Sequence, residues 1–414
     1  MEATMFRRVC SPAFYSRSHS VLRCFLNEKF TLNKACVFHP SLRASSSATQ
    51  SQPADVRQVF RTSVDDPRQH TLDHEGLYYR ISEVEANSLF NECIQPHQLR
   101  LMKTFNETCV MVRKPSLELE DYIRNINFKH PVHRFVLYGL QGAGKSAVMN
   151  HTMHACYRDN WIIVHVPWAG RWVRGWHKEV TESTYKAGRY DLPTDGAAWL
   201  NHFQIQNQGR LKDLKTTSEY TWTKREKADI GTPLEEIINF GLTRVKFSTD
   251  CIGVILKELR HQAQNNGLKI FVGINAVNAF YVEWDNRSAL LTPEKRKLHP
   301  SEFSVIHNFK KMLSPTWTNG VVVCTVDQET NTELVAKNYT PFYLLGQQGF
   351  AALDPFVPIL VPEYSEKEAL STINYFIDRN WIQNEFGKTE EGKKEIMFVS
   401  NKNAFSLTKL CCGL

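Results

Sequence analysis

Residues 139–146 read Gly139-Leu140-Gln141-Gly142-Ala143-Gly144-Lys145-Ser146, a complete match to the pattern G-x-x-x-x-G-K-[ST]. The apolar run Arg134 to Tyr138 precedes this stretch, and Ser146 to Arg158 has helical composition. The β-branched run Trp161 to Val166 follows and stops at Pro167. This order predicts a strand–loop–helix–strand unit, and therefore an α/β fold whose parallel sheet is covered by helices on both faces.

The residue types of this loop are those that a polyphosphate requires. Small residues let successive backbone N–H groups surround an anion, and the start of the following helix adds its dipole to the same pocket. Lys145 is expected to place its charge at the β- and γ-phosphates, and the Ser146 hydroxyl to bind Mg²⁺. Because the loop lies between a strand and a helix, we predict a P-loop in which all eight residues, 139–146, bind a nucleotide.

Hydrolysis is a separate question, because P-loop NTPases normally end a later buried strand with an aspartate that orients Mg²⁺. The run Ile270 to Ile274 is the expected strand, and it is followed by Asn275 and Ala276. An amide at Asn275 can contact the metal through water but brings no negative charge. We therefore predict weak or absent NTPase activity, no catalytic residue, and a metal site of Ser146 with Asn275 as a possible partner. Glu283 and Asp285 are interpreted as surface charges.

The sequence leaves the base of the nucleotide open. The guanine-selecting signature N-K-x-D is absent, since Asn401-Lys402-Asn403-Ala404 lacks its aspartate. Asp327 follows the predicted strand Val321 to Val326 and could read guanine, although a polar strand end is the favoured interpretation. GTP, GDP and ATP all remain candidates.

Two helices between these strands are indicated by their ends. Thr232, Pro233 and Glu235 predict an N-cap, a proline at the first helical position and a capping-box acid. A second helix is expected to end at Asn266-Gly267, where glycine can adopt the left-handed conformation. Residues from Asp55 to about Glu120 show weak periodicity and are interpreted as an extension that wraps the core.

The composition of the 414 residues, with 42% apolar residues and a formal charge of +7, is that of a globular chain. No apolar stretch reaches the roughly 20 residues of a membrane span, so no membrane anchor is expected. Residues 1–54 hold seven Lys and Arg against two Glu. This Arg- and Ser-rich start, poor in acids, is typical of a mitochondrial transit peptide, with a disordered tail as the alternative. Ten cysteines without regular spacing indicate reduced thiols.

Because residues 55–414 carry only about +2, any RNA contact must come from local patches. One segment mixes aromatic and cationic residues from Trp168 to Lys178, and its tryptophans at 168, 172 and 176 favour the buried stripe of a helix over a base-stacking platform. Two further basic clusters are Arg210, Lys212, Lys215, Lys224, Arg225 and Lys227, and Lys295, Arg296, Lys297, Lys310 and Lys311. His151 and His154 are interpreted as ordinary helix residues.

Five parts of the chain together resemble the death-associated protein 3 family. They are the P-loop 139–146, Gly231 to Val245, Gly253 to Leu259, Leu353 to Val361, and Glu390 to Glu395. The resemblance covers about residue 130 to the C-terminus. Its later segments are more diagnostic than the P-loop, because unrelated NTPases lack them.

This resemblance implies a P-loop NTPase core related to AAA-type signalling ATPases, in a GTP-binding protein of the mitochondrial small ribosomal subunit. It implies a guanine nucleotide with Mg²⁺, contacts with small-subunit proteins, rRNA and the large subunit across the intersubunit face, a place in the mitochondrial matrix, and a link to apoptosis. By this resemblance, an aspartate is expected at the position that Asn275 occupies. That departure favours a structural nucleotide over turnover.

The resulting prediction has four parts: a transit peptide or disordered segment 1–52, an N-terminal extension 53–129, a P-loop NTPase domain 130–345 and a smaller C-terminal helical subdomain 346–414. The favoured function is a nucleotide-binding structural constituent of the mitochondrial small ribosomal subunit. One alternative is an active AAA-type ATPase or GTPase that acts as an assembly factor or chaperone. A second is a signalling adaptor whose P-loop controls oligomerisation.

Overall fold

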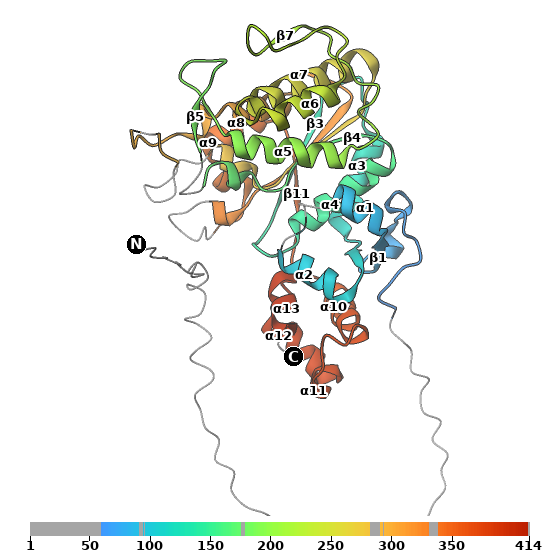
Figure 1. Cartoon of the computed structure of the whole chain (residues 1–414). Helices are drawn as coiled ribbons and strands as arrows, with labels where there is room; N and C mark the ends of the chain where they lie inside the picture. Colours follow the sequence, from blue (N-terminus) through green and yellow to red (C-terminus); the bar gives the residue numbers. More distant parts are fainter. Residues whose placement is uncertain are drawn as a thin grey trace, which may run out of the picture. The chain divides into compact units, whose positions relative to one another are not determined.

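A five-stranded parallel sheet forms the centre of the molecule (Figure 1). This computed structural model describes residues 59–412, apart from 91–93, 95, 175–178, 282–289, 293 and 331–337. The strand order is β11-β3-β10-β9-β4. The strands are β3 (His133–Tyr138), β4 (Ile162–Val166), β9 (Ile270–Ile274), β10 (Gly320–Thr325) and β11 (Val357–Leu360). The predicted α/β class and parallel sheet are confirmed.

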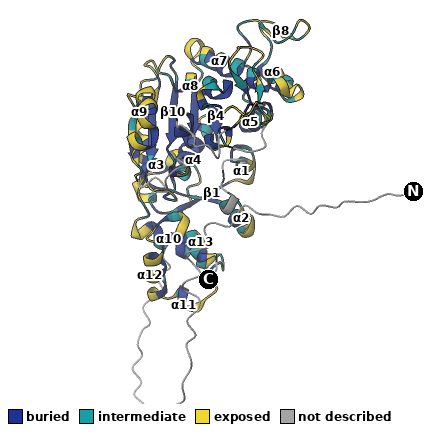
Figure 2. Cartoon of the chain, turned by 90° about the vertical axis from the view of Figure 1, so that its left-hand side faces the viewer, coloured by how far each residue is buried: buried dark blue, intermediate teal, exposed yellow. Residues whose placement is uncertain are grey.

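Side chains of the sheet alternate between two apolar layers, as the two-residue period of a strand requires. Phe135 and Leu137 of β3 pack into one layer, while Val136 packs into the other. Strands β4 and β9 are buried at every residue, which is the pattern of parallel strands with both faces covered. Figure 2, coloured by burial, shows the buried strands inside and the helices with their outer faces exposed.

Helices cover both faces of the sheet. The layer that includes Phe135 is closed by α3 (Lys114–Asn125) and α4 (Lys145–Arg158). The opposite layer is closed by α5 (Pro193–Gln206), α6 (Leu234–Thr243), α7 (Ser248–Asn266), α8 (Ser304–Leu313) and α9 (Pro341–Leu353). The strand-to-helix crossover β3–α4–β4 therefore carries the P-loop at the carboxyl edge of the sheet, where α/β folds bind ligands.

The N-terminal extension and the C-terminal helices share a third apolar core. The extension contains β1 (Tyr78–Ile81) paired antiparallel with β2 (Thr108–Met111), α1 (Glu83–Leu89) and α2 (Pro96–Phe105). The C-terminal helices are α10 (Glu366–Asp378), α11 (Glu385–Lys388), α12 (Glu390–Val399) and α13 (Ala404–Cys411). Side chains from β1, β2, α2, α10, α12 and α13 pack together in this core.

The remaining elements are short. Two hairpins pair β5 (Thr181–Glu182) with β6 (Tyr190–Asp191) and β7 (Tyr220–Thr221) with β8 (Lys227–Ala228). The 3-10 helices are η2 (Pro67–Gln69), η3 (Leu72–His74), η4 (Ala169–Trp172), η5 (Val245–Phe247), η6 (Val277–Phe280), η7 (Pro300–Glu302) and η8 (Gln328–Thr330). The predicted boundary at 345/346 lies inside α9, and the sheet takes strands from both sides of it.

Two local predictions were wrong in detail. Helix α6 begins at Leu234, but the hydroxyl of Thr232 donates to the carbonyl of Asp229 and caps no helix. The stretch from Trp168 forms a single 3-10 turn in place of an α-helix, since Trp168 is extended. Trp172 is nevertheless buried against Phe280 and Phe309, as the core interpretation required. Trp176 lies outside the described residues, as do Glu283, Asp285 and the predicted transit peptide.

Other expectations agree with the structure. Helix α7 ends where predicted, with Gly267 in the left-handed conformation. The cysteines of the described part are free: Cys109, Cys156, Cys251, Cys324, Cys411 and Cys412. Within the described residues, every helix is too short or too polar to cross a membrane.

His151 of α4 joins the N-terminal extension through a buried polar cluster. Its Nε2 lies 2.8 Å from Nδ1 of His70, and its Nδ1 lies 3.1 Å from a carboxylate oxygen of Glu120. Burial raises the pKa of Glu120 to about 8. Burial, followed by the neighbouring His70, lowers the pKa of His151 well below its usual range. Below about pH 8 the Glu120 carboxyl group and the His151 ring are therefore both neutral, although Arg124 lies 3.1 Å from the other Glu120 oxygen and favours its charged form.

Replacing Glu120 with glutamine should reduce the pH dependence of stability between about pH 5 and pH 8. An unfolded glutamic acid releases its proton near pH ~4.3, whereas the folded chain holds this proton up to about pH 8. Stability is therefore lost as the pH rises through this window. Urea unfolding at several pH values measures the loss, with the exposed Glu118→Gln as control. Parallel pH profiles for wild type and Glu120→Gln would contradict the buried neutral carboxyl.

Candidate nucleotide site

The loop between β3 and α4 has the conformation of an anion-binding turn. Gly142 and Gly144 have φ values of 79° and 96°, which only glycine adopts without strain. Among the described residues, no hydrogen-bond partner is found for the amide N–H groups of Gly142, Gly144, Lys145 and Ser146. These groups belong to the loop and the first turn of α4, where the helix dipole also favours an anion.

The side chain of Lys145 lies folded against its own loop. Its ammonium donates to the carbonyl oxygens of Gly139 and Leu140, both at 2.9 Å. The residue is 8% exposed. Burial lowers the pKa of this ammonium, and the carboxylates of Asp327 and Glu329 oppose that effect. Lys145 is thus held by two weak neutral acceptors, which a phosphate oxygen could replace with a charge-assisted bond.

Ser146 and Asn275 meet, as their positions at the same edge of the sheet predict. The hydroxyl of Ser146 donates to Oδ1 of Asn275 at 3.1 Å, and the hydroxyl of Thr325 donates to the same oxygen at 3.1 Å. Thr325 ends β10, the strand between β3 and β9, and also accepts from the amide of Ala276. Asn275 therefore occupies the place of the expected aspartate, with its carbonyl oxygen directed at the predicted metal-binding hydroxyl.

Carboxylates reach this site from the loop that follows β10. Asp327 and Glu329 both act on the charge of Lys145. Gln328 accepts from the amide of Gln141 at 2.7 Å, and the Gln141 side chain donates to Glu329. Burial, and then the nearby Asp327, raises the pKa of Glu329. Two carboxyl groups thus lie on the loop after β10, the strand beside β3, and their charges act on Lys145.

The C-terminal helices close the loop from the other side. The side-chain amide of Asn403 donates to the carbonyl of Gln141 at 2.9 Å, and the amide of Phe405 donates to the carbonyl of Gly142 at 3.1 Å. Both residues stand at the start of α13. The first residues of the last helix therefore fix the backbone of the phosphate loop.

Arg113 joins three parts of the chain at the P-loop. Its guanidinium donates to the carbonyl of Ala143 at 2.6 Å and pairs with Glu368 of α10 at 2.8 Å. Side chains of Arg113 and Glu368 are 3% and 4% exposed. The ring of Tyr364 lies 4.9 Å from the guanidinium carbon. This buried ion pair ties the start of α3, the P-loop and the C-terminal region together.

Sequence reasoning found the loop, Ser146 and Asn275, but it missed the residues that surround them. Arg113, Gln328, Glu329, Asn403 and Phe405 come from segments 26 or more residues from the P-loop in sequence. The charge of Asp327, the possible guanine reader of the sequence analysis, acts on Lys145. The only sequence signal was position: the loop 327–329 follows a strand that was predicted to be buried.

Two cavities lie away from this loop. One, of about 340 Å³, is lined by Tyr281, Lys310, Leu313, Ser314, Pro315, Gln348 and Ala352. The other, of about 350 Å³, lies along α7 and includes Lys257, Arg260 and His261. Neither cavity includes a residue of the P-loop.

Comparison with known proteins identifies the family. Residues 110–410 match the family described as mitochondrial ribosomal death-associated protein 3. The chain belongs to this family. The mouse (Mus musculus) small ribosomal subunit protein mS29 is 39% identical over 384 residues, which cover 92% of this chain and 96% of that protein. The bovine (Bos taurus) protein of the same name is 40% identical over 359 residues, 87% of this chain and 89% of its own.

Two solved structures show a distant likeness to the chain. The structure of Cdc6p from Pyrobaculum aerophilum has 10% identity and a TM-score of 0.31, and covers 80% of this chain and 64% of its own. A chain of the HORMA:CdnC:Trip13 complex from E. coli has 9% identity and a TM-score of 0.28, covering 80% and 82%. Both TM-scores are too low to support a fold assignment. The assignment to the P-loop NTPase fold therefore depends on the order of the parallel strands and on the P-loop sequence.

Proposed function

We propose that this protein is a structural component of the small subunit of the mitochondrial ribosome and holds a purine nucleotide, GTP or GDP, in its P-loop. Membership of the mitochondrial ribosomal death-associated protein 3 family carries the ribosomal part. The names of the mouse and bovine relatives, small ribosomal subunit protein mS29, support it. The proposed location is the mitochondrial ribosome in the matrix, and the proposed partners are small-subunit proteins, rRNA and the large subunit.

The proposal of nucleotide binding rests on two features of the P-loop. Several of its backbone amides have no partner among the described residues, and Lys145 donates only to neutral carbonyl oxygens. All eight residues, 139–146, are proposed to bind the phosphates, with Ser146 as the Mg²⁺ ligand and Asn275 acting through water. A ligand held at 100 times its dissociation constant adds about 2.7 kcal/mol to the stability of the folded chain. The proposed role of the nucleotide is therefore to stabilise the junction where Arg113, the loop and α13 meet. The link to apoptosis stays a prediction.

Two measurements test this proposal. The nucleotide released on denaturing the purified protein should be a guanine nucleotide by mass. A tagged full-length chain should sediment with the mitochondrial small subunit. An adenine nucleotide would overturn the choice of base, and a chain found only in free fractions would overturn the ribosomal role.

Changing Asn275 to aspartate should tighten Mg²⁺ binding in the nucleotide complex by roughly tenfold or more, about 1.4 kcal/mol. The change places a carboxylate beside the Ser146 hydroxyl, where the amide now accepts at 3.1 Å. Nucleotide affinity measured across a Mg²⁺ series reports the effect. Asn125→Asp, at an exposed helix end, has the same charge change and should alter nothing. Equal Mg²⁺ dependence for wild type and Asn275→Asp would contradict the assigned metal position.

A second function, slow nucleotide hydrolysis, is favoured by the carboxylates of Asp327 and Glu329 near Lys145. They could assist a Mg²⁺-bound water despite the amide at Asn275. Phosphate release by the purified protein should then fall in Lys145→Ala and in Glu329→Gln. Release that is absent in the wild type, or unchanged in both variants, would leave the structural role alone.

A further inference from the structure

A surface rich in cations spans α7, α8 and the β5–β6 hairpin. Helices α7 and α8 pack against each other, and α8 also contacts β6; Figure 1 shows the hairpin at the end of these helices. We call this the α7–α8 cationic surface and define it by Lys186, Arg189, Lys257, Arg260, Lys310 and Lys311. Sequence clustering had grouped Lys310 and Lys311 with Arg296, but Arg296 pairs with Glu302. The fold instead brings the two lysines to cations from other elements.

These cations lie close enough to repel one another. Burial lowers the pKa of Lys311, and the charges of Arg260 and Arg189 lower it further. Burial lowers the pKa of His307 on α8 to about 4, and the charges of Arg189 and of the nearby lysines contribute to this shift. Within the described part of the chain, none of the six cations forms a salt bridge. The surface therefore holds positive charge that internal carboxylates leave uncompensated.

Nearby acids are already engaged. Glu258 of α7 accepts from the amide and hydroxyl of Thr217 and from the hydroxyl of Tyr220. Asp250 accepts from Thr184 at 3.2 Å, and burial, with Asp191 close by, raises its pKa to about 6. Asp191 is itself buried, with Arg189 near it. In the described part of the chain, none of these three acids forms a salt bridge with the six cations.

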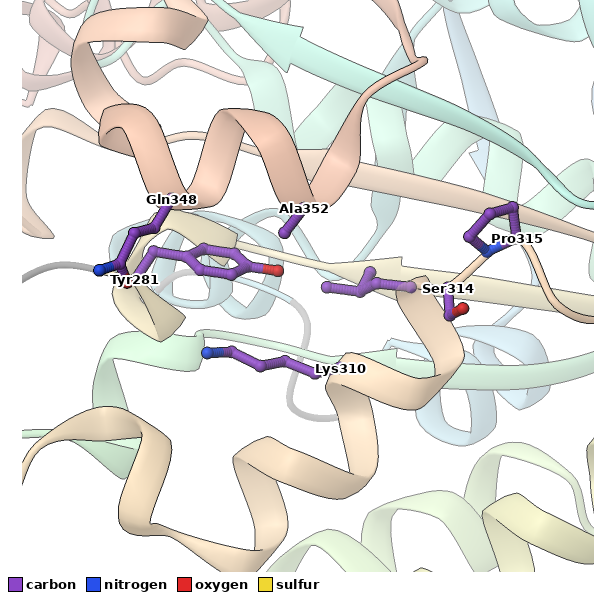
Figure 3. Close-up of a pocket in the computed structure, with 7 residues that line it drawn as sticks. Tyr281, Lys310, Ser314, Pro315, Gln348 and Ala352 are labelled. Carbon is purple, nitrogen blue, oxygen red and sulfur yellow. The ribbon is translucent and has the colours of Figure 1, made fainter.

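A polar groove runs along this surface. The cavity of about 350 Å³ beside α7 is lined by the cationic residues Lys257 and Arg260 and by one acid, Glu258. Its other lining residues are His261, Gln264, Trp317 and the hydroxyl residues 217, 218 and 316. The Nε of Arg260 is buried and has no hydrogen-bond partner in the described part of the chain. The ammonium of Lys310 lies 4.5 Å from the ring of Tyr281 in the cavity of about 340 Å³ (Figure 3). Cations, hydroxyls and amides are the groups that contact nucleic-acid phosphates and sugars.

An exposed aromatic ring on the β5–β6 hairpin favours RNA as the ligand of this surface. Tyr185 is 84% exposed at the tip of the β5–β6 hairpin, next to Lys186. Because most of this ring is exposed, it can stack on an unpaired base while the adjacent cations hold the backbone. An acidic protein or an anionic membrane would gain from the charge but has no base to stack.

We propose that the α7–α8 cationic surface binds the phosphate backbone of a folded RNA, with Tyr185 stacked on an unpaired base at its edge. For a ribosomal component the natural RNA is that of its own subunit, so this inference rests on the proposed function. Beyond the proposed function, the α7–α8 cationic surface is assigned to the RNA backbone and Tyr185 to an unpaired base.

The test measures binding of a labelled RNA stem–loop to the full chain by fluorescence anisotropy between 50 and 200 mM KCl. The triple variant Lys257→Ala, Arg260→Ala, Lys311→Ala should bind about a hundredfold more weakly at 100 mM salt, and its salt slope should fall by about 2 to 3. The matched control is Lys212→Ala, Lys224→Ala, Lys227→Ala, which removes three exposed lysines from the other basic cluster and should match wild type.

Tyr185→Ala separates stacking from charge. It should weaken binding by about five- to a hundredfold while the salt slope stays that of wild type. Thermal melting verifies that each variant is folded. The proposal would be overturned if the triple variant bound RNA with the affinity and the salt slope of the wild type. Tighter binding to polyglutamate, or to phosphatidylserine vesicles, than to the stem–loop would also overturn it. If RNA binding fails while the chain still sediments with the small subunit, only this inference is lost.

Discussion

Lys145→Ala should abolish the stabilisation of the protein by GTP and Mg²⁺. The ammonium now donates to the carbonyls of Gly139 and Leu140, and we expect it to transfer to phosphate oxygens on binding. Charge-assisted bonds to phosphate are about twice as strong as neutral ones. A loss of roughly a hundredfold in affinity, about 2.7 kcal/mol, would remove most of the stabilisation that a saturating nucleotide supplies.

The measurement is the melting temperature with and without nucleotide. Wild type should melt several degrees higher with Mg²⁺-GTP, and Lys145→Ala should show almost no shift. Lys114→Ala is the matched control, because Lys114 is likewise the first residue of a helix but is exposed. An equal nucleotide-induced shift in wild type and Lys145→Ala would contradict the assigned role of the lysine.

Arg113→Ala should destabilise the folded chain by about 3–5 kcal/mol, because it leaves the buried carboxylate of Glu368 without its partner. The same change removes the donor to the carbonyl of Ala143 and should also weaken nucleotide binding. Urea unfolding of the nucleotide-free protein measures the first effect, and calorimetric titration measures the second.

Two variants show whether the unpaired charge causes the loss. Arg113→Met with Glu368→Gln removes both charges and should recover part of the stability that Arg113→Ala loses. Arg244→Ala breaks an exposed ion pair with Glu226 and should cost about 1 kcal/mol or less. If Arg113→Ala proves no more destabilising than Arg244→Ala, the pair does not hold the junction together.

The central sheet could be predicted from the sequence because its signals are local. Strands β3, β4, β9 and β10 are apolar runs with clear ends, and the loop 139–146 fixes the order of the first crossover. Edge strand β11 was not predicted. Its residues 357–360 include Pro358, which cannot donate a hydrogen bond to a neighbouring strand and is a weak signal for a strand. Its place beside β3 depends on pairing that no local pattern encodes.

The surroundings of the site were beyond sequence reasoning for a different reason. Asn403 contacts Gln141 across 262 residues, and Arg113 contacts Glu368 across 255. Such contacts follow from how the N-terminal extension and the C-terminal helices pack, which depends on a shared apolar core. By contrast, Ser146 and Asn275 could be predicted to meet, since both follow parallel strands that end at one edge of the sheet.

The α7–α8 cationic surface could be predicted only in part from the sequence. Lys310 and Lys311 were recognisable as part of a basic run, but their neighbours Lys186, Arg189 and Arg260 come from the hairpin and from α7. A net charge near +2 for residues 55–414 gave no sign of a concentrated patch. Charge density on a surface is set by the fold, whereas the sequence gives only the sum.

Calorimetric titration of the purified full-length protein with GTP in the presence of Mg²⁺ tests the central claim most directly. We expect one saturable site per chain, with binding lost in Lys145→Ala and retained in Lys114→Ala. No detectable binding of GTP, GDP or ATP up to millimolar concentration, by protein shown to be free of nucleotide, would contradict it.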